Sequence, residues 1–218
     1  MNLLDFSFSQ KDLIYKNLKG ANSRSHIYFT FDDGPVDIYS EKLLDRLNAL
    51  NLKVTFYVVG IKAQRHKDII QRFISEGHSI GDHSWGHEFS YYFSSRSKIH
   101  QWISYSWEKL SDLLGQRPKG FRSPAGVVTP PLLKALGQLR IPLVLWNRRF
   151  FDTQFDIAKV NKTASELFQA GDIVLLHENG YPHRFESLNV FLSKYAGEIK
   201  KLGFECAAIQ DYQLSQVR

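Results

Sequence analysis

The sequence has a single cysteine, Cys206, among its 218 residues. One cysteine excludes a disulfide within the chain, and the setting GFECAAI is that of a small core residue on a late strand. The chain also lacks a Pro/Gly/Ser-rich linker, a low-complexity tract and an internal repeat. We therefore predict one domain, residues 1–218, whose 43% hydrophobic content supports a sizeable core.

Long apolar segments are missing as well. The opening stretch MNLLDFSFSQKDLIYKN contains no run of signal-peptide length and carries Asp5 early. No later run reaches the length of a membrane span, so we expect no transmembrane segment. If Met1 is the native start, the absence of an export signal predicts a cytoplasmic protein. A trimmed chain would remove the basis for that prediction.

The positive charge is not concentrated anywhere. The net charge is +6 and the pI is about 9.3, values that by themselves suggest nucleic acid or an anionic surface as partner. The Lys and Arg residues are scattered, however, and no basic run is interleaved with aromatic residues. We therefore predict no nucleic-acid binding, and nothing in the sequence predicts a protein partner.

Short β-rich runs alternate with amphipathic helical patterns along most of the chain. The patterns predict strands at 26–31, 53–59, 78–84, 119–124, 142–147, 172–177 and 205–210, and helices at 40–51, 68–77, 99–115, 130–139, 162–171 and 188–203. Several helical patterns end in glycine, as helix C-caps do. About seven β/α units of this kind predict a parallel sheet covered by helices, either open or closed into a barrel.

Polar side chains at the strand ends favour the barrel. They stand at or just after the C-terminal ends of predicted strands: Asp32, Asp33, His83, Arg122, Asn147 and His177. The strand ends of a β/α barrel face one rim, where such folds build their sites. We therefore predict an α/β fold, a distorted (β/α) barrel of about seven parallel strands with its active site at the C-terminal strand ends.

The segment DHSWGH suggests a metal site. It places His83 and His87 four residues apart, which on a helical turn brings both imidazoles within reach of one metal ion. Such a pair is often just two polar residues at the surface, and the HExxH pattern of metalloproteases is absent because Ser84 occupies its second position. A carboxylate from another strand, Asp32 or Asp33, would complete a catalytic site that keeps a position open for water.

Four motifs together resemble one family. They are TFDDGP at 30–35, HSWGH at 83–87, FRSPAG at 121–126 and IVLLHENG at 173–180. Their order and spacing are similar to those of the polysaccharide deacetylases, carbohydrate esterase family 4, also called the nodulation-type deacetylase domain. The resemblance covers about residues 26–212 and implies a distorted (β/α) barrel with hydrolase activity.

The resemblance also implies a metal site. It assigns Asp33, His83 and His87 as the metal ligands. Two histidines and one carboxylate suit zinc, so we expect Zn²⁺, with Co²⁺, Ni²⁺ or Mn²⁺ as other occupants of the same ligands.

The resemblance further implies catalytic roles for five residues. Asp32 corresponds to the general base that takes a proton from water, and Arg122 to the arginine that orients this base. His177 corresponds to the general acid for the leaving amine, and Asp152 to the aspartate that holds it and raises its pKa. The backbone N–H of Ala125 corresponds to a donor to the oxyanion.

Three positions depart from the family pattern. Ala125 stands where an aromatic residue is common, Thr153 where a tryptophan is common, and Glu178 where an aspartate follows the late histidine. The exchange at Thr153 leaves the acetyl pocket open to other side chains. Candidates to line it are Phe150, Phe151, Trp146 and Leu175.

These features predict a metal-dependent hydrolase that removes the N-acetyl group from an amino sugar of the N-acetylglucosamine type. The substrate would be an N-acetylated glycan: an oligosaccharide, polysaccharide or glycan precursor. Removal of formyl, or hydrolysis of a non-polymeric amide, is the alternative among enzymes. A catalytically silent carbohydrate-binding protein is the alternative from another class.

Overall fold

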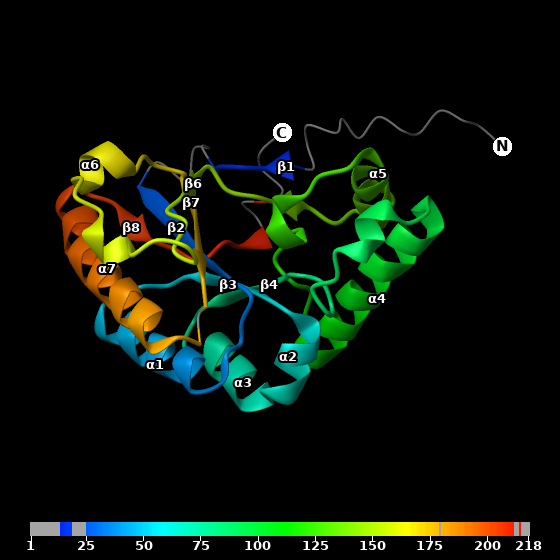
Figure 1. Cartoon of the computed structure of the whole chain (residues 1–218), viewed down its shortest axis with the longest axis horizontal. Coiled ribbons are helices and arrows are strands. Elements are labelled where there is room, and N and C mark those ends of the chain that lie inside the picture. The colour runs from blue at the N-terminus through cyan, green and yellow to red at the C-terminus, as the bar shows by residue number, and fades with distance from the viewer. Residues whose placement is uncertain (1–13, 19–24, 179, 212–213, 215–218) are drawn as a thin grey trace.

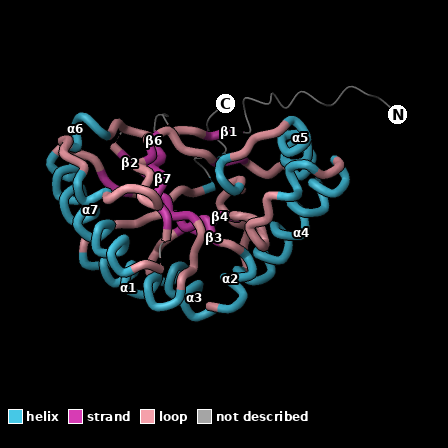
Figure 2. Tube along the Cα trace, viewed as in Figure 1, coloured by secondary structure: helices cyan, strands magenta, loops and turns pink. Residues whose placement is uncertain are grey.

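The structure is a computed structural model that describes residues 14–18, 25–178, 180–211 and 214. Short strands occupy the centre and helices surround them on the outside (Figures 1 and 2). The strands are β1 (Ile14–Tyr15), β2 (His26–Asp32), β3 (Thr55–Val58), β4 (Ser79–Asp82), β5 (Leu143–Val144), β6 (Arg148–Arg149), β7 (Ile173–His177) and β8 (Glu205–Cys206). The helices are α1 (Asp37–Ala49), α2 (Gly60–Arg65), α3 (Lys67–Ser75), α4 (Arg96–Leu114), α5 (Pro130–Leu139), α6 (Ala164–Leu167) and α7 (Pro182–Lys201). This alternation is the predicted α/β organisation.

The strands form a closed ring. Their order is β4-β3-β2-β7-β6, and each of these ladders is parallel. Isolated parallel bridges join Asp82 at the end of β4 to Phe121, and Phe121 to Leu143 in β5. β5 leads along the chain into β6, and β6 pairs with β7, so the ring is completed by the chain between β5 and β6 and not by a further ladder. The predicted distorted barrel of parallel strands is therefore confirmed.

The barrel is distorted where two predicted elements, the strand at 119–124 and the helix at 162–171, form only in part. Of the strand predicted at 119–124, the structure retains only the bridges of Phe121, because Gly120 has a φ of +81° that interrupts the extended backbone. The helix predicted at 162–171 is reduced to α6, because Phe168 is extended and turns its ring into the core. The strand structure is also interrupted between β5 and β6. The barrel is therefore irregular on the side formed by Phe121, β5 and β6.

Strand β2 is buried on both faces. Phe29 and Phe31 point outward into the core that the sheet shares with α1, α3 and α7. Tyr28 alternates with them, faces the barrel interior and packs in a cluster with Tyr57. A strand covered on both sides reads as a nearly continuous apolar run, as the predicted strand at 26–31 does.

The ends of α4 follow local chemistry. Ser95 precedes the helix and accepts a hydrogen bond from the Lys98 N–H, and Gly115 ends it in the left-handed region with a φ of +65°. The glycine cap predicted there is confirmed. None of the described helices contains an apolar stretch long enough to cross a membrane.

Cys206 lies on β8, as predicted, and packs against the core beside α7. Burial raises the pKa of its thiol to about 12, so the thiol is protonated at neutral pH.

Candidate active site

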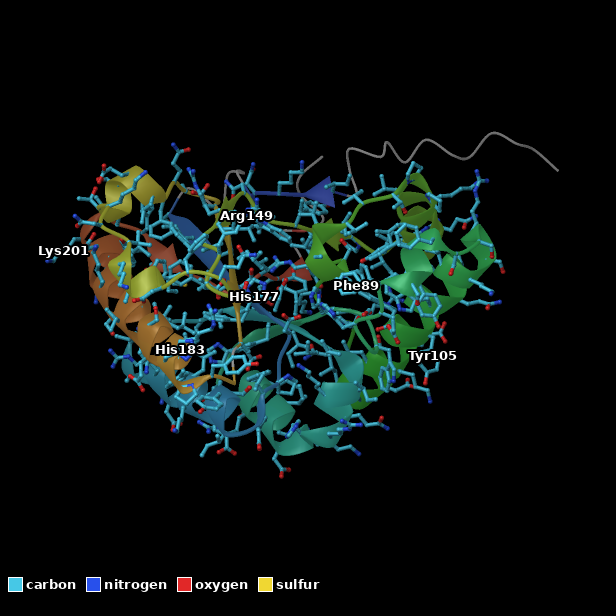
Figure 3. The ribbon with its side chains drawn as sticks, in the orientation of Figure 1. Phe89, Tyr105, Arg149, His177, His183 and Lys201 are labelled. Carbon is cyan, nitrogen blue, oxygen red and sulfur yellow. The ribbon has the colours of Figure 1, made fainter. Side chains whose placement is uncertain are left out.

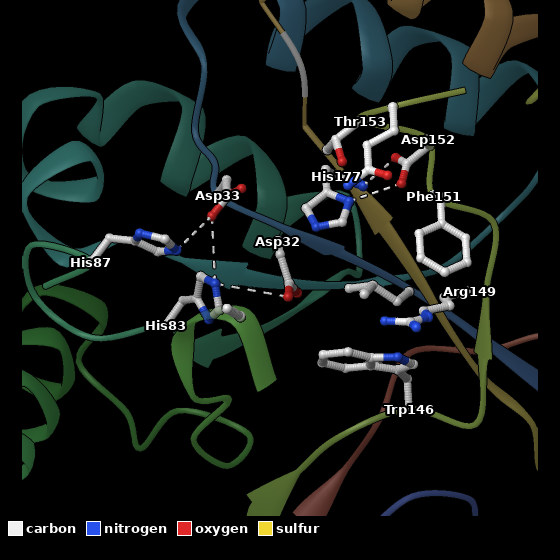
Figure 4. Close-up of a pocket in the computed structure, with 13 residues that line it drawn as sticks. Asp32, Asp33, His83, His87, Trp146, Arg149, Phe151, Asp152, Thr153 and His177 are labelled. Carbon is white, nitrogen blue, oxygen red and sulfur yellow. Dashed lines mark hydrogen bonds and ion pairs between the residues drawn. The ribbon is translucent and has the colours of Figure 1, made fainter. Parts of the chain in front are cut away.

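A pocket of about 320 Å³ opens at the C-terminal ends of β2, β4 and β7 (Figure 4). Its lining residues are Asp32, Asp33, His83, His87, Ala125, Trp146, Arg149, Phe151, Asp152, Thr153, Gln154, Leu175 and His177. The structure therefore brings most of the sequence-predicted site residues to one rim. The exceptions are Arg122, which is fully buried behind Asp32, and Asn147 and Phe150, which lie outside the pocket lining. In Figure 3, His177 marks the position of this pocket near the middle of the molecule.

Arg122 holds Asp32 from inside the barrel. Its Nη1 donates to Asp32 Oδ1 at 2.7 Å and to Thr30 Oγ1 at 2.6 Å. Its Nε and Nη2 donate to the backbone carbonyls of Val144 and Leu145 at 3.0 and 3.1 Å. A buried ion pair is stable only when its remaining polar atoms are satisfied, and this guanidinium has a partner on each of its three nitrogens. The Asp32 carboxylate is consequently fixed in direction and compensated in charge.

Asp33 follows the end of β2 and turns the chain. Its φ of +71° places it in the left-handed region, which aspartate tolerates better than most residues. Its Oδ1 lies 3.5 Å from His83 Nε2 and 3.2 Å from His87 Nε2. Asp32 and Asp33 both line the pocket, and the left-handed turn gives them different partners.

The two histidines stand on a loop after β4. The sequence spacing suggested one side of a helical turn, and this interpretation is wrong: residues 83–87 contain no helix, and Ser84 and His87 have φ values of +66° and +61°. The Ser84 Oγ accepts a hydrogen bond from the His87 N–H at 3.0 Å, which helps to close the loop. The loop still directs His83 and His87 toward Asp33.

The donor atoms fit a divalent metal ion. One ligand atom from each of Asp33, His83 and His87 lies within 4.8 Å of the others. Ligands about 2.0–2.1 Å from a tetrahedral zinc ion lie about 3.3 Å apart, close to the 3.5 and 3.2 Å separations of the carboxylate and the imidazoles. His83 Nδ1 hydrogen-bonds to the Arg122 carbonyl at 2.8 Å and so directs Nε2 at the cluster. Metal-bound histidines are oriented in the same way, by a hydrogen bond from the ring nitrogen that does not bind the metal.

The electrostatics of the cluster favour an ionised carboxylate. Burial raises the pKa of Asp33, but hydrogen bonds from His83 and His87 outweigh it and hold this pKa well below its usual range. Burial lowers the pKa of His83, but the nearby carboxylates of Asp32 and Asp33 raise it by more. The cluster therefore presents an anionic ligand to a cation.

His177, the last residue of β7, is held by Asp152. The two Asp152 oxygens accept from His177 Nδ1 and from its backbone N–H, each at 2.8 Å. Arg184, in the first turn of α7, donates to the Asp152 carbonyl at 2.8 Å. Burial lowers the pKa of His177, but Asp152 raises it by more, so the imidazole stays protonated to higher pH.

Ala125 lies at the edge of the pocket in the turn Pro124–Gly126. Its φ is +54°, and its N–H donates no hydrogen bond to any residue that the structure describes. A free N–H at a pocket wall is available to an oxygen atom of a ligand.

The apolar wall consists of Trp146, Leu175 and Phe151, with Thr153 beside them. Phe150, the fourth candidate for the acetyl pocket, does not line this cavity. Its ring packs in the core, with its centroid 4.9 Å from that of Phe191.

Asn147 does not join the site, so its prediction as a rim residue is wrong. Its side-chain amide donates to Asp172 Oδ1 at 2.6 Å and accepts from the Ile173 N–H at 2.9 Å. Both partners lie at the N-terminal end of β7, far along the strand from His177. Asn147 therefore links the segment between β5 and β6 to the start of β7.

Sequence reasoning missed two lining residues, Arg149 and Gln154. Arg149 lies on β6 next to Arg148, and alternation along this short strand separates their side chains. The predicted strand ended at residue 147 and did not include Arg149, and two residues are too few to show alternation in the sequence.

Glu178 is buried beneath the turn that carries Asp33. Its carboxylate accepts a hydrogen bond from Ser40, and burial raises its pKa to about 8. A Cβ on Gly34 would lie 1.5 Å from Glu178 Oε1, so any other residue at position 34 would displace the Glu178 carboxylate. The exchange of aspartate for glutamate at position 178 thus changes the packing beneath the turn that carries Asp33.

Together these contacts place three groups of side chains around one pocket. They are a carboxylate held by an arginine, an Asp–His–His cluster, and a histidine held by an aspartate. They define a hydrolase of the metal-assisted class, built on a distorted β/α barrel.

Comparison with known proteins gives the family. A sequence model described as polysaccharide deacetylase matches residues 19–144. A peptidoglycan-N-acetylglucosamine deacetylase of Bacillus cereus is 28% identical over 90% of this chain and 92% of its own length. Chitin deacetylase 2 of Saccharomyces cerevisiae is 30% identical over 84% of this chain and 59% of its own length. The chain therefore belongs to the polysaccharide deacetylase family, and its enzyme class is polysaccharide N-deacetylase.

A solved structure supports the same assignment. The crystal structure of a peptidoglycan N-acetylglucosamine deacetylase in complex with an N-hydroxybenzamide superimposes with a TM-score of 0.79. It is 25% identical and covers 92% of each chain. Coverage differs among relatives, since this chain spans 39% of the length of a Listeria monocytogenes enzyme of the same kind.

Proposed function

We propose that this protein hydrolyses the acetamido group of N-acetylglucosamine residues in a glycan chain, with a zinc ion bound by Asp33, His83 and His87. The observation that carries this proposal is the convergence of a held base, a metal-ligand cluster and a held acid on one pocket. The relatives named as peptidoglycan and chitin deacetylases support the acetamido sugar as substrate.

Asp32 is placed to take a proton from water. Its Oδ1 is engaged by Arg122, whereas its Oδ2 faces the metal-ligand cluster, 3.8 Å from His83 Nε2. A divalent ion held there would polarise the acetyl carbonyl and acidify a water molecule, whose pKa then falls from about 15.7 toward about 7. Asp32 accepts the proton as the water oxygen attacks the carbonyl carbon.

The Ala125 N–H is placed to donate to the oxygen that becomes negative in this step. This donor breaks no hydrogen bond to a described residue when it binds an oxygen atom, because the N–H of Ala125 has no such partner at the pocket wall. His177 Nε2 then donates its proton to the amide nitrogen, and the C–N bond breaks. The products are acetate and the free amine of the sugar.

Zinc is proposed from the ligand set alone. Two imidazoles and one carboxylate, with a further position open, are a common catalytic zinc arrangement. Metal analysis of the purified protein tests this choice directly. We expect one zinc per chain after loading, and a different metal retained through purification would contradict it.

The deacetylase proposal is tested with acetylated glycans. The zinc-loaded protein is incubated with N-acetylglucosamine oligosaccharides, with matched N-formylglucosamine oligosaccharides and with peptidoglycan fragments, and acetate, formate and new amines are measured. Acetate and amine in equal amounts are expected, and Asp32→Asn removes both while His183→Gln, at a position outside the pocket lining, keeps them. Formate without acetate would favour the deformylase, and binding without any release the silent carbohydrate-binding protein.

A further inference from the structure

Strand β6 consists of two adjacent arginines with opposite surroundings. The Nε of Arg148 donates to the fully buried Asp172 Oδ2 at 2.7 Å, so this arginine is neutralised inside the fold. Arg149 lines the active-site pocket and forms no ion pair or side-chain hydrogen bond with any residue that the structure describes. The two neighbouring arginines of this strand thus differ. Arg148 is paired within the fold, whereas Arg149 has no ion pair with a described residue.

Arg149 packs on an aromatic ring at the mouth of the pocket. Its guanidinium carbon lies 4.1 Å from the centroid of Phe151, and in Figure 4 its side chain points from the ribbon into the pocket. Phe151 is 41% exposed, and the centroid of Phe155, which is also exposed, lies 6.1 Å away. A guanidinium stacked on a ring keeps its in-plane N–H donors free for an anion.

The carboxylates of the pocket leave this charge uncompensated. Asp32 is paired with Arg122, Asp33 with the two metal-site histidines, and Asp152 with His177. Arg149 is therefore a cation, with free donors, in a pocket whose acidic residues already have partners. Its planar fork matches a carboxylate in bidentate fashion.

We propose that Arg149 and Phe151 form a subsite for the sugar next to the reacting N-acetylglucosamine, and that this sugar bears a carboxylate. This inference rests on the proposed function. Phe151 offers a ring face to the sugar, and Arg149 binds its carboxylate. Peptidoglycan has such a neighbour, because its alternate sugar carries a lactyl group that ends in a carboxylate or continues into a peptide. Chitin has none, so the subsite selects the acidic glycan over the neutral one.

Four substrates test the subsite. The first is a tetrasaccharide of alternating N-acetylglucosamine and N-acetylmuramic acid with free lactyl carboxylates. The second and third are the same tetrasaccharide with a methylamide or a dipeptide on each lactyl group. The fourth is chitotetraose in its fully N-acetylated form. We expect Arg149→Gln to lower kcat/KM for the free carboxylate form at least tenfold, the loss of a charge-assisted hydrogen bond. It should change the methylamide and chitotetraose values less than about twofold.

Two further variants provide controls. Arg149→Glu should reverse the preference, so that the methylamide becomes the better substrate, while Arg117→Gln removes the same charge at an exposed position outside the pocket. A preference that follows the dipeptide form places the recognised carboxylate on the peptide, which also supports an acidic-glycan subsite. An equal loss on all four substrates, or no loss on any, would overturn the proposal.

Binding separates this inference from the deacetylase proposal. Calorimetry on Asp32→Asn with the carboxylate and methylamide tetrasaccharides measures the subsite without turnover. We expect the carboxylate form to bind more tightly, and Asp32→Asn/Arg149→Gln to lose that difference. If wild-type protein released no acetate but the difference persisted, the activity would be refuted and the subsite kept. Equal binding of both glycans by Asp32→Asn would refute the subsite whatever the turnover.

Discussion

The two walls of the pocket are built in contrasting ways. One wall comes from β2, β4 and residue 122, where the side chains of Asp32, His83 and Arg122 are almost fully buried and multiply hydrogen-bonded. The other follows the two-residue strand β6, where Arg149 and Phe151 are exposed. The contrast matches the two proposals made above, that the buried wall holds the reacting groups and that the exposed wall selects the glycan. Substitutions in the two walls should therefore change different kinetic constants.

The largest effect is expected from the metal ligands of the buried wall. His83→Ala removes one of three ligands and should abolish both bound metal and activity. Metal content measured by atomic emission, alongside acetate release, checks this, with His183→Ala as the control. Full metal occupancy in His83→Ala would contradict the ligand assignment.

Asp32→Asn should separate catalysis from metal binding within the same wall. The amide keeps the shape but cannot accept a proton, so kcat should fall by about 10²–10⁴-fold while metal content stays that of the wild type. Steady-state kinetics and metal analysis of the same preparation test this. A loss of metal with the activity would mean that Asp32 is a ligand and not the base.

Asp152→Asn should change the pH dependence. Asp152 raises the pKa of His177. As the proposed acid, His177 must be protonated to donate to the leaving nitrogen, so Asp152 should extend activity to higher pH. Without this carboxylate the pKa of His177 falls, and the alkaline limb of the pH–rate profile moves to lower pH. On the alkaline side, the rate should fall about tenfold for every pH unit by which the limb moves. An unchanged alkaline limb would remove His177 from the role of acid.

The smallest effect is expected on the exposed wall. Phe151→Ala removes the ring face and should raise KM for oligosaccharides about two- to tenfold with little change in kcat. The matched control is Phe155→Ala, at an exposed ring that does not line the pocket. A fall in kcat at constant KM would show that this wall also takes part in the chemical step, and the contrast between the walls would fail.

Much of the buried wall could be predicted from sequence, and little of the exposed one. The sequence predicts β2 from an apolar run that ends in two carboxylates, and the four motifs lie at the strand ends that meet at the rim. Asp33 and His87 escape simple periodicity, because their positive φ values belong to turns and not to a strand or helix. The spacing of the histidines pointed to two residues that the structure places together beside Asp33, but the geometric reason was wrong.

On the exposed wall, small shifts in strand boundaries decide the outcome. Phe150 and Phe151 are adjacent, and which of them faces the core depends on a backbone turn at Phe151, whose φ is +53°. Arg149 was overlooked because β6 pairs for only two residues, too few for an alternation pattern. The single-domain assignment and the individual catalytic roles stay predictions.

The packing around Arg122 also determines how molecules reach and leave the site. Its guanidinium carbon lies 3.9 Å from the ring centroid of Tyr57, and together with Tyr28 these fully buried side chains fill the barrel below Asp32. In the described part of the chain, these side chains therefore block a route through the barrel on the inner side of Asp32. We expect acetate to leave on the side from which the glycan enters, either past the glycan or after it.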